Sequence, residues 1–318
     1  MKLIKPKPLN PGDKIGVISP SGTIKGIEAR FNRGVETLKI LGFDVAVGAN
    51  AFNSLRHMAG TDRERAEDFN RMFADQGIKA VFCSRGGESA MRILEYIDYG
   101  LIAGNSKILM GMSDISVLLN AVSRLASLVT FHGPNVSYGI NCEKFGFPGM
   151  VEYSRTSLIE SLTGEGFSGE VRYVFEPRVI REGSAEGRLI GGNLDCIEKL
   201  SGTGFEPDFD GAILLLEEID ESASEMERDL MPLKLRGSLS KLNGIVVGHL
   251  EKCFSSRAEE EFFYQTLAEL TEDDGYPVLK IDEFGHHAYN CVLPLGAMAK
   301  IENEKLILLE PGVSDSLP

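Results

Sequence analysis

The sequence predicts an α/β protein with an N-terminal, mostly parallel sheet flanked by helices and a smaller C-terminal α/β domain with mixed strands. Two observations predict it. Up to about residue 135, short apolar runs of strand length alternate with stretches whose apolar residues recur at helical spacing. A second such series starts near Gly183, after a segment rich in Gly, Ser, Glu and Tyr. We therefore expect an N-terminal domain over 1–150, a connector over 151–182 and a C-terminal domain over 183–318.

The N-terminal elements each have a local signal. Strands are expected where apolar residues form short runs, at 14–18, 43–47, 78–83, 108–110 and 128–131. Helices are expected between them, at 24–41, 61–74, 89–97 and 115–125. The second helix has Thr61 and Glu64 placed for a capping box. Since this order predicts parallel strands covered on both faces, a ligand should bind beyond their carboxyl ends.

The C-terminal elements follow the same logic. Strands are expected at 186–190, 212–219, 244–249 and 276–279. Helices are expected at 195–200, 224–235 and 259–271, with a weaker one in the connector at 153–162. A glycine turn is expected at Gly191-Gly192, after the first of these strands. The alternating pattern of 293–309 predicts a small antiparallel sheet.

The bulk properties exclude several classes of partner. Of the 318 residues, 43% are apolar and 25% charged, as in a globular protein. A net charge of −14 argues against a nucleic-acid partner, which needs a basic face. The basic start, 1–8, lacks the apolar segment of a secretory signal, and no run approaches the ~18 apolar residues of a membrane helix. The five cysteines are scattered without a CxxC pair, so we expect neither disulfides nor zinc, and a cytoplasmic setting.

One turn is a candidate for a nucleophile. Gly111-Met112-Ser113-Asp114 places a serine between a strand and a helix, where its hydroxyl and the following N–H groups face the same space. By itself the stretch is more typical of a helix cap formed by Ser113 or Asp114. Two further polar turns, 84–88 and 132–135, also follow strands of the predicted sheet. Because such turns meet at one sheet edge, they favour a site that contains Ser113.

A nucleophilic serine needs a base, and a carboxylate that orients the base. His286 and His287 both follow a glycine in a loop, and their spacing does not separate them. Glu217 closes the apolar run 213–216, where a charge is usually paired or functional, although a solvated strand end is an equal alternative. The order Ser113, Glu217, His286 proves nothing alone, since the same geometry occurs in several chain orders.

Seven motifs extend over nearly the whole chain. They are Ser84-Arg85-Gly86-Gly87, Gly111-Met112-Ser113-Asp114-Ile115-Ser116, His132-Gly133-Pro134, Gly191-Gly192-Asn193-Leu194, Leu216-Glu217-Glu218, Gly244-Ile245-Val246-Val247-Gly248, and Gly285-His286 with Leu293-Pro294-Leu295-Gly296. In this order they resemble the LD-carboxypeptidase family of serine peptidases, which includes murein tetrapeptide carboxypeptidases and microcin C immunity peptidases. A single GxSD would be weak evidence, whereas seven ordered motifs are specific.

The resemblance implies a two-domain enzyme with its site at the domain interface and no metal or other cofactor. Ser113 is the implied nucleophile, His286 the general base and Glu217 the group that orients the base. The implied oxyanion hole consists of backbone N–H groups, those of Asp114 and of Gly86 or Gly87. The resemblance also implies a homodimer.

The substrate pocket is where the chain departs from the family pattern. Its candidate residues are Arg85, Glu88 and His132. Glu88 and the two residues after it stand where the peptidoglycan enzymes usually carry an aromatic residue and a glycine. In the immunity branch, the residue type at the position of Arg85 varies instead. The chain therefore mixes features of both branches.

The implied activity is hydrolysis of the bond before a C-terminal residue through an acyl-enzyme, with the terminal D-alanine of a murein tetrapeptide as the expected leaving residue. The alternative is an immunity-type peptidase or amidase that cleaves aminoacyl- or peptidyl-nucleotides with the same triad. An alternative of another class is a non-catalytic protein that binds a peptide or muropeptide. A nucleotide-binding Rossmann domain is disfavoured, because no GxGxxG follows the first strand.

Overall fold

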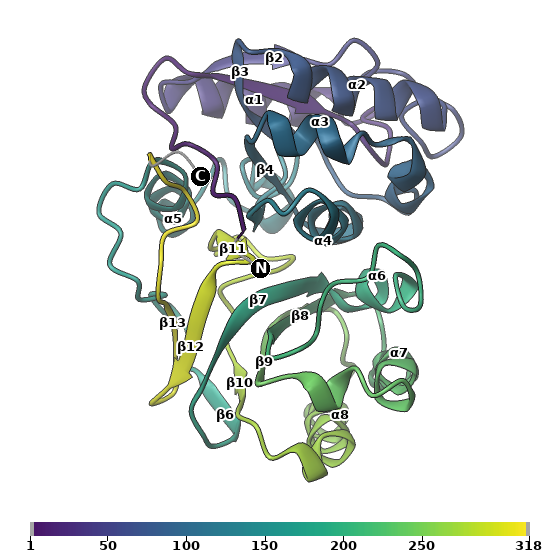
Figure 1. Ribbon diagram of the computed structural model, residues 1–318, viewed down its shortest axis with the longest axis vertical. Coiled ribbons are helices and arrows are strands. Elements are labelled where there is room, and N and C mark those ends of the chain that lie inside the picture. The colour runs from purple at the N-terminus through teal and green to yellow at the C-terminus, as the bar shows by residue number, and fades with distance from the viewer. Residues whose placement is uncertain (1–2, 316–318) are drawn as a thin grey trace.

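Two sheets, one above the other, form the frame of the protein (Figure 1). The computed structural model describes residues 3–315, so Met1, Lys2 and 316–318 of the predicted domains lie outside it. The first sheet has the spatial order β11 (Leu293–Leu295), β5 (Thr130–His132), β4 (Ile108–Gly111), β3 (Ile78–Cys83), β1 (Lys14–Ile18) and β2 (Asp44–Val47). The second has the order β13 (Lys305–Leu308), β12 (Met298–Glu302), β7 (Ala185–Asn193), β8 (Ile213–Ile219), β9 (Gly244–Glu251), β10 (Val278–Lys280) and β6 (Arg178–Arg181).

The pairing confirms the predicted α/β class. Strands β2, β1, β3, β4 and β5 are parallel, and only β11 runs antiparallel to its neighbour in the first sheet. The second sheet is mixed: β7 to β10 are parallel, while β12, β13 and β6 pair antiparallel. Within residues 3–315, no helix combines the length and the apolar character needed to cross a membrane.

Helices pack around both sheets (Figure 1). Those of the first half are α1 (Glu28–Ile40), α2 (Asp62–Ala74), α3 (Tyr99–Gly104) and α4 (Ser116–Leu125). Those of the connector and second half are α5 (Glu152–Thr163), α6 (Leu194–Lys199), α7 (Ala223–Leu235) and α8 (Arg257–Leu270). Short 3-10 helices are η1 (Ala90–Tyr96), η2 (Ser113–Ile115), η3 (Glu143–Phe145), η4 (Leu239–Lys241) and η5 (Glu272–Asp274). Helix α2 begins with the predicted Thr61–Glu64 capping box.

Four local predictions need correction. The segment expected as a helix at 89–97 is the 3-10 helix η1, followed by the unpredicted α3. The pair Gly191-Gly192 lies inside β7 and makes no turn. Strand β6, within the predicted connector, pairs with β10 at the edge of the second sheet. In the segment 293–309, only β12 and β13 form the expected antiparallel pair, because β11 joins β5 of the first sheet.

Helix α4 joins the two halves. Its residues 116–122 are all buried, although apolar spacing alone indicated one buried face. One continuous apolar core includes Leu118 and Val122 of this helix together with Leu189 of β7 and Leu215 of β8. In Figure 1, α4 lies between the upper sheet and the elements β7 and α6. The helix is therefore packed on both sides, and it fixes the position of one sheet relative to the other.

Hydrogen bonds also fix the position of α4 on β7. The side chain of Asn120 donates to the carbonyl of Gly191 at 2.8 Å and accepts from the N–H of Gly191 at 3.0 Å. The Ser116 hydroxyl accepts from the N–H of Asn193 at 3.1 Å. All three bonds reach β7, and all partners are buried. The first turns of α4 are thereby set in register with the carboxyl end of β7.

The variant Asn120→Ala should lower the free energy of unfolding by about 2–4 kcal/mol, because it leaves the N–H and the carbonyl of Gly191 buried without partners. Urea unfolding followed by circular dichroism measures this loss. The matched control is Asn243→Ala, whose exposed amide also donates to a backbone carbonyl, that of Glu186, at 2.7 Å. Equal losses in the two variants would contradict the role given to Asn120.

Candidate active site

Ser113 stands on a strained turn between β4 and α4. Its φ is +66°, in the left-handed region that non-glycine residues rarely adopt. Met112 before it is extended, and a Cβ added at Gly111 would lie 2.7 Å from the side chain of Ile115. Such strain costs about 1–3 kcal/mol and persists only where the surrounding structure enforces it. The half-buried Ser113 therefore has the sharp turn expected of a nucleophile.

The alternative of a helix cap is not supported. Neither Ser113 nor Asp114 makes a side-chain hydrogen bond that caps η2 or α4. The carboxylate of Asp114 instead turns away from the helix and accepts the N–H groups of Ser89 at 2.7 Å and Ala90 at 2.8 Å, and the hydroxyl of Ser21. Asp114 thus ties the turn that carries Ser113 to the loops that follow β1 and β3.

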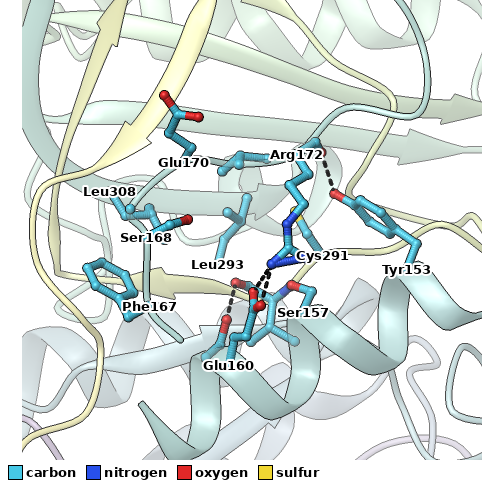
Figure 2. A pocket seen from close by; sticks show the side chains of 14 residues that line it. Tyr153, Ser157, Glu160, Phe167, Ser168, Glu170, Arg172, Cys291, Leu293 and Leu308 are labelled. Carbon is cyan, nitrogen blue, oxygen red and sulfur yellow. Dashed lines mark hydrogen bonds and ion pairs between the residues drawn. The ribbon is translucent and has the colours of Figure 1, made fainter. Parts of the chain in front are cut away.

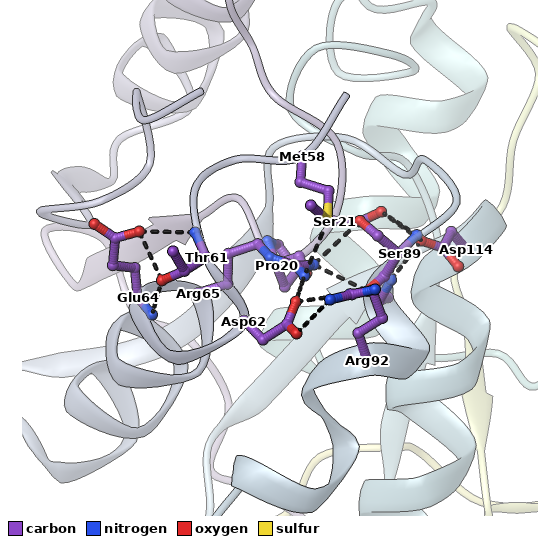
Figure 3. A network of polar contacts seen from close by, with 11 residues as sticks. Pro20, Ser21, Met58, Thr61, Asp62, Glu64, Arg65, Ser89, Arg92 and Asp114 are labelled. Carbon is purple, nitrogen blue, oxygen red and sulfur yellow. Dashed lines mark hydrogen bonds and ion pairs between the residues drawn. The ribbon is translucent and has the colours of Figure 1, made fainter. Parts of the chain in front are cut away.

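A buried arginine holds those two loops from the other side (Figure 3). Arg65 of α2 is 1% exposed, and its Nη1 donates to the carbonyls of Pro20 at 2.7 Å and Ser89 at 2.9 Å. Its Nη2 binds Asp62 at 2.6 Å, and Asp62 also binds Arg92. A charge of this kind is rarely buried unless it is paired. The network fixes the loop between Ser84 and Ala90, which contains the predicted oxyanion donors.

Gly86 and Ser113 face one another. A Cβ added at Gly86 would lie 2.8 Å from Cβ of Ser113 and 3.3 Å from the backbone N of Asp114. Only a glycine allows this close approach. Among the hydrogen bonds of residues 3–315, none uses the N–H of Gly86 or Gly87. The predicted oxyanion donors therefore lie beside the predicted nucleophile with unoccupied N–H groups.

The second half of the chain supplies a buried acid–base pair. Glu217 of β8 is fully buried, and its Oε2 lies 2.6 Å from Nδ1 of His286, which is 8% exposed. Burial alone would raise the pKa of Glu217, but the charge and hydrogen bond of His286, together with the nearby His132, lower that pKa to about 2. Burial would lower the pKa of His286, but Glu217 outweighs it and raises that pKa above its ordinary value. Glu217 therefore stays ionised and orients the ring.

The structure separates the two neighbouring histidines, which the sequence left open. His287 makes no contact with Glu217 but stacks on His249, with ring centroids 4.3 Å apart. Burial and the charge of His249 lower the pKa of His287 to about 4. His249 in turn binds Asp282 at 2.9 Å. Of the two candidates, only His286 is placed with the buried carboxylate.

The carboxyl ends of the two sheets meet at this point. His132, at the end of β5, is fully buried with its Nε2 3.9 Å from Oε1 of Glu217, so it lies behind the acid and not on an open surface. A Cβ added at Gly192 would clash with Oγ of Ser116 and lie 3.1 Å from the His132 ring, so a glycine in β7 allows this close approach. Asn290 donates to Sδ of Met112 at 3.1 Å and to the carbonyl of Gly285 at 2.9 Å. These contacts join the neighbours of Ser113 to those of His286.

No hydrogen bond between Ser113 and His286 occurs among the contacts of residues 3–315. Catalytic hydrogen bonds are often long without substrate and tighten when it binds. The residues next to Ser113 and His286 are thus linked through Asn290, while the two side chains themselves are not hydrogen-bonded.

The remaining pocket candidates lie at the rim. Arg85 is half-buried, and its Nη1 reaches the carbonyl of Thr23 at 3.3 Å. Glu88 is exposed. Both belong to the loop that contains Gly86, which lies beside Ser113.

Four further polar residues lie around the site, namely Asn120, Asn193, Asn290 and Glu218. Asn193 and Glu218 belong to motifs of the sequence, but Asn120 and Asn290 were not singled out from it. Glu218 accepts from Asn193 Nδ2 at 2.6 Å, and burial and the charge of Glu217 raise the pKa of Glu218 to about 7. The one available signal was Asn120, a polar residue within an otherwise apolar helix surface.

A small cavity elsewhere is not a competing site. It lies between α5, the connector residues 167–172 and strands β11 and β13 (Figure 2). Arg172 closes it with an ion pair to Glu160, and Tyr153 donates to the carbonyl of Arg172 at 2.8 Å. Its volume of about 50 Å³ suits a water or two and not a peptide. None of the predicted site residues lines it.

The chain is similar to known proteins over nearly its whole length. Residues 15–133 match the family model described as LD-carboxypeptidase N-terminal domain, and residues 186–301 match the LD-carboxypeptidase C-terminal domain. A probable murein peptide carboxypeptidase of Bacillus subtilis is 35% identical, over 98% of this chain and 96% of the relative. The microcin C7 self-immunity protein MccF of Escherichia coli is 30% identical, over 96% of each chain.

Solved structures extend the likeness to the fold. The structure of MccF in its wild-type apo state has a TM-score of 0.87 at 28% identity, covering 98% of this chain and 100% of the other. A muramoyltetrapeptide carboxypeptidase from Oxalobacter formigenes has a TM-score of 0.78 at 27% identity, covering 92% of this chain and 97% of the other. With both domain models matched in order and relatives alike over nearly their whole length, the chain belongs to the LD-carboxypeptidase family of serine peptidases.

Proposed function

We propose that the chain is a serine carboxypeptidase that releases the terminal D-alanine of a murein tetrapeptide in cytoplasmic cell-wall recycling. The observation that carries the proposal is the buried pair of His286 and Glu217, joined at 2.6 Å, next to the strained turn of Ser113. The names of the relatives from Bacillus subtilis and Oxalobacter formigenes support the substrate. A homodimer is part of the proposal on the family resemblance alone.

In the proposed acylation, Oγ of Ser113 attacks the carbonyl carbon before the C-terminal residue and gives its proton to Nε2 of His286. Glu217 accepts the hydrogen bond from Nδ1–H and so fixes the tautomer with a free Nε2. The negative charge that develops on the carbonyl oxygen is stabilised by the N–H of Asp114 and that of Gly86 or Gly87. These donors are already oriented, so little reorganisation is needed.

His286 then donates a proton twice, first to the leaving nitrogen and later to the Ser113 oxygen. His286 gives the first proton to the leaving nitrogen, the C–N bond breaks, and the C-terminal residue departs as a free amino acid. A water molecule next attacks the ester carbonyl of Ser113 and passes its own proton to His286. Collapse of the second intermediate releases the shortened peptide as an acid, and His286 returns the proton to the Ser113 oxygen.

One observation favours a second candidate. The MccF structure is more similar to this chain than the muramoyltetrapeptide carboxypeptidase, with TM-scores of 0.87 and 0.78. MccF has been solved in complex with aspartyl sulfamoyl adenosine. The second candidate is therefore a peptidase or amidase that cleaves aminoacyl- or peptidyl-nucleotides with the same three residues.

A direct comparison of substrates should separate the candidates. We expect the purified protein to release D-alanine from a murein tetrapeptide with a higher kcat/KM than it cleaves an aminoacyl sulfamoyl adenosine, with both products measured by mass spectrometry. Faster cleavage of the nucleotide would replace the first candidate by the second. Binding of the tetrapeptide without any cleavage would indicate a non-catalytic binding protein.

The variant Ser113→Ala should lower kcat by about 10⁴–10⁶-fold, since the attacking oxygen is lost, and should still bind the tetrapeptide. A fluorophosphonate probe should label the wild-type protein and not this variant. Ser168→Ala is the matched control, because Ser168 is exposed and lines the separate cavity of Figure 2. Unchanged turnover in Ser113→Ala would show that another group is the nucleophile.

The pH dependence of kcat/KM should report on His286. The base must be neutral, so activity should fall as the pH drops through the raised pKa of His286. Glu217→Gln removes the charge that raises this pKa, so the acidic limb should move to lower pH while the rate falls by about 10³–10⁴-fold. Glu251→Gln, whose carboxylate lies 3.2 Å from Nε2 of the other histidine His249, is the control. An acidic limb that stays in place in Glu217→Gln would contradict the pairing.

A further inference from the structure

Three positive side chains gather around one aromatic ring at the rim of the site. The ring centroid of Tyr138 lies 4.9 Å from Arg30 Cζ, 5.6 Å from Arg85 Cζ and 5.3 Å from Lys144 Nζ. The three residues come from α1, from the loop after β3 and from η3. Each contact has the distance of a cation–π interaction, which holds a cation without neutralising its charge.

None of the three cations has a carboxylate partner among the ion pairs of residues 3–315. Arg33, one turn after Arg30, shows the contrast, because it binds Glu143. The protein as a whole carries a net charge of −14, so this local excess of positive charge runs against its composition. Like charges held together repel one another, and a bound anion would offset that repulsion.

Arg85 also has unused hydrogen-bonding capacity. Its Nε is buried without a partner, and Nη1 makes only the long bond of 3.3 Å to the Thr23 carbonyl. A guanidinium has five N–H donors, arranged in a planar fork that matches a carboxylate. A half-buried arginine with a free donor and no anion is in the state expected of a binding group without its ligand.

The cluster borders the nucleophile. Arg85 directly precedes Gly86, whose Cβ position lies 2.8 Å from Ser113. The turn that carries Tyr138 is bonded to the same region, since Asn135 Nδ2 donates to the Met112 carbonyl at 3.2 Å. Lys144 lies near enough to His286 for its positive charge to lower the pKa of that ring. This effect is the last and smallest of the named contributions, and it opposes the rise that Glu217 causes. An anion held by this cluster would thus lie next to the loop of Gly86, beside Ser113.

We propose that Arg85, assisted by Arg30 and Lys144, binds the terminal carboxylate of the residue that leaves. This inference rests on the proposed carboxypeptidase function and explains how the enzyme acts only at a chain end, since an internal residue offers no carboxylate there. A charge-assisted, two-pronged bond to Arg85 gives both affinity and orientation. Tyr138 holds the three cations in place and leaves their charge available.

The experiment compares a murein tetrapeptide that has a free C-terminal carboxylate with the same peptide as its C-terminal amide. The wild-type protein should prefer the acid by about 10- to 100-fold in kcat/KM. Arg85→Gln should lose that preference through a raised KM for the acid, with the amide nearly unaffected, and Arg85→Lys should keep part of it. Arg30→Gln and Lys144→Gln should each weaken the preference less.

The control is Arg33→Gln, which removes a charge from the same helix as Arg30 but one that Glu143 already neutralises. Calorimetric binding of both peptides to Ser113→Ala, with and without Arg85→Gln, separates recognition from turnover. Wild-type protein that cleaves acid and amide equally would overturn this inference and leave the proposed function standing. Preferential binding of the acid, lost in Arg85→Gln, would support the inference even if neither peptide is cleaved. Equal loss of both peptides in Arg85→Gln would overturn it, since that variant would then only disturb the loop.

Discussion

The double burial of helix α4 is the constraint on which the rest of the structure depends. A helix covered on both sides cannot slide, and its Asn120 and Ser116 fix it to β7 through the backbone of Gly191 and Asn193. Ser113 stands just before this helix, so the docking that joins the two sheets also aims the serine. The fold and the site therefore share one interface, and loosening it would affect both.

The buried charge of Glu217 depends on that same interface. A carboxylate removed from water is costly unless it is paired and hydrogen-bonded. Its bond to His286 comes from the second half of the chain, whereas His132 approaches it from the first. The ionised acid in turn raises the pKa of His286. The buried pair thus orients the ring of His286 and raises its pKa above the ordinary value.

Much of the fold could be predicted because its signals are local. The alternation of strands and helices and the capping box at Thr61 follow from spacing within a few residues. Predictions failed where distant contacts override local preference. Gly191-Gly192 suggests a turn, but Gly191 allows the close approach of β7 to β8, and Gly192 that of β7 to α4 and His132. Strand β11 joins the first sheet by pairing with β5, which lies about 160 positions earlier in the chain. No local pattern encodes a pairing over such a separation.

The sequence by itself determined the α/β class, the family resemblance and the candidates Ser113, Glu217 and His286. Ordered motifs and apolar periodicity can be recognised along the chain without knowledge of the fold. Only the tertiary structure showed that the turn of Ser113 is not a helix cap, since that depends on the φ of Ser113 and on the loops that Asp114 binds. It also decided between His286 and His287, which differ by one position but point to different partners. The cations around Tyr138 likewise come from three distant segments, so they form one cluster of positive charge only in the folded chain.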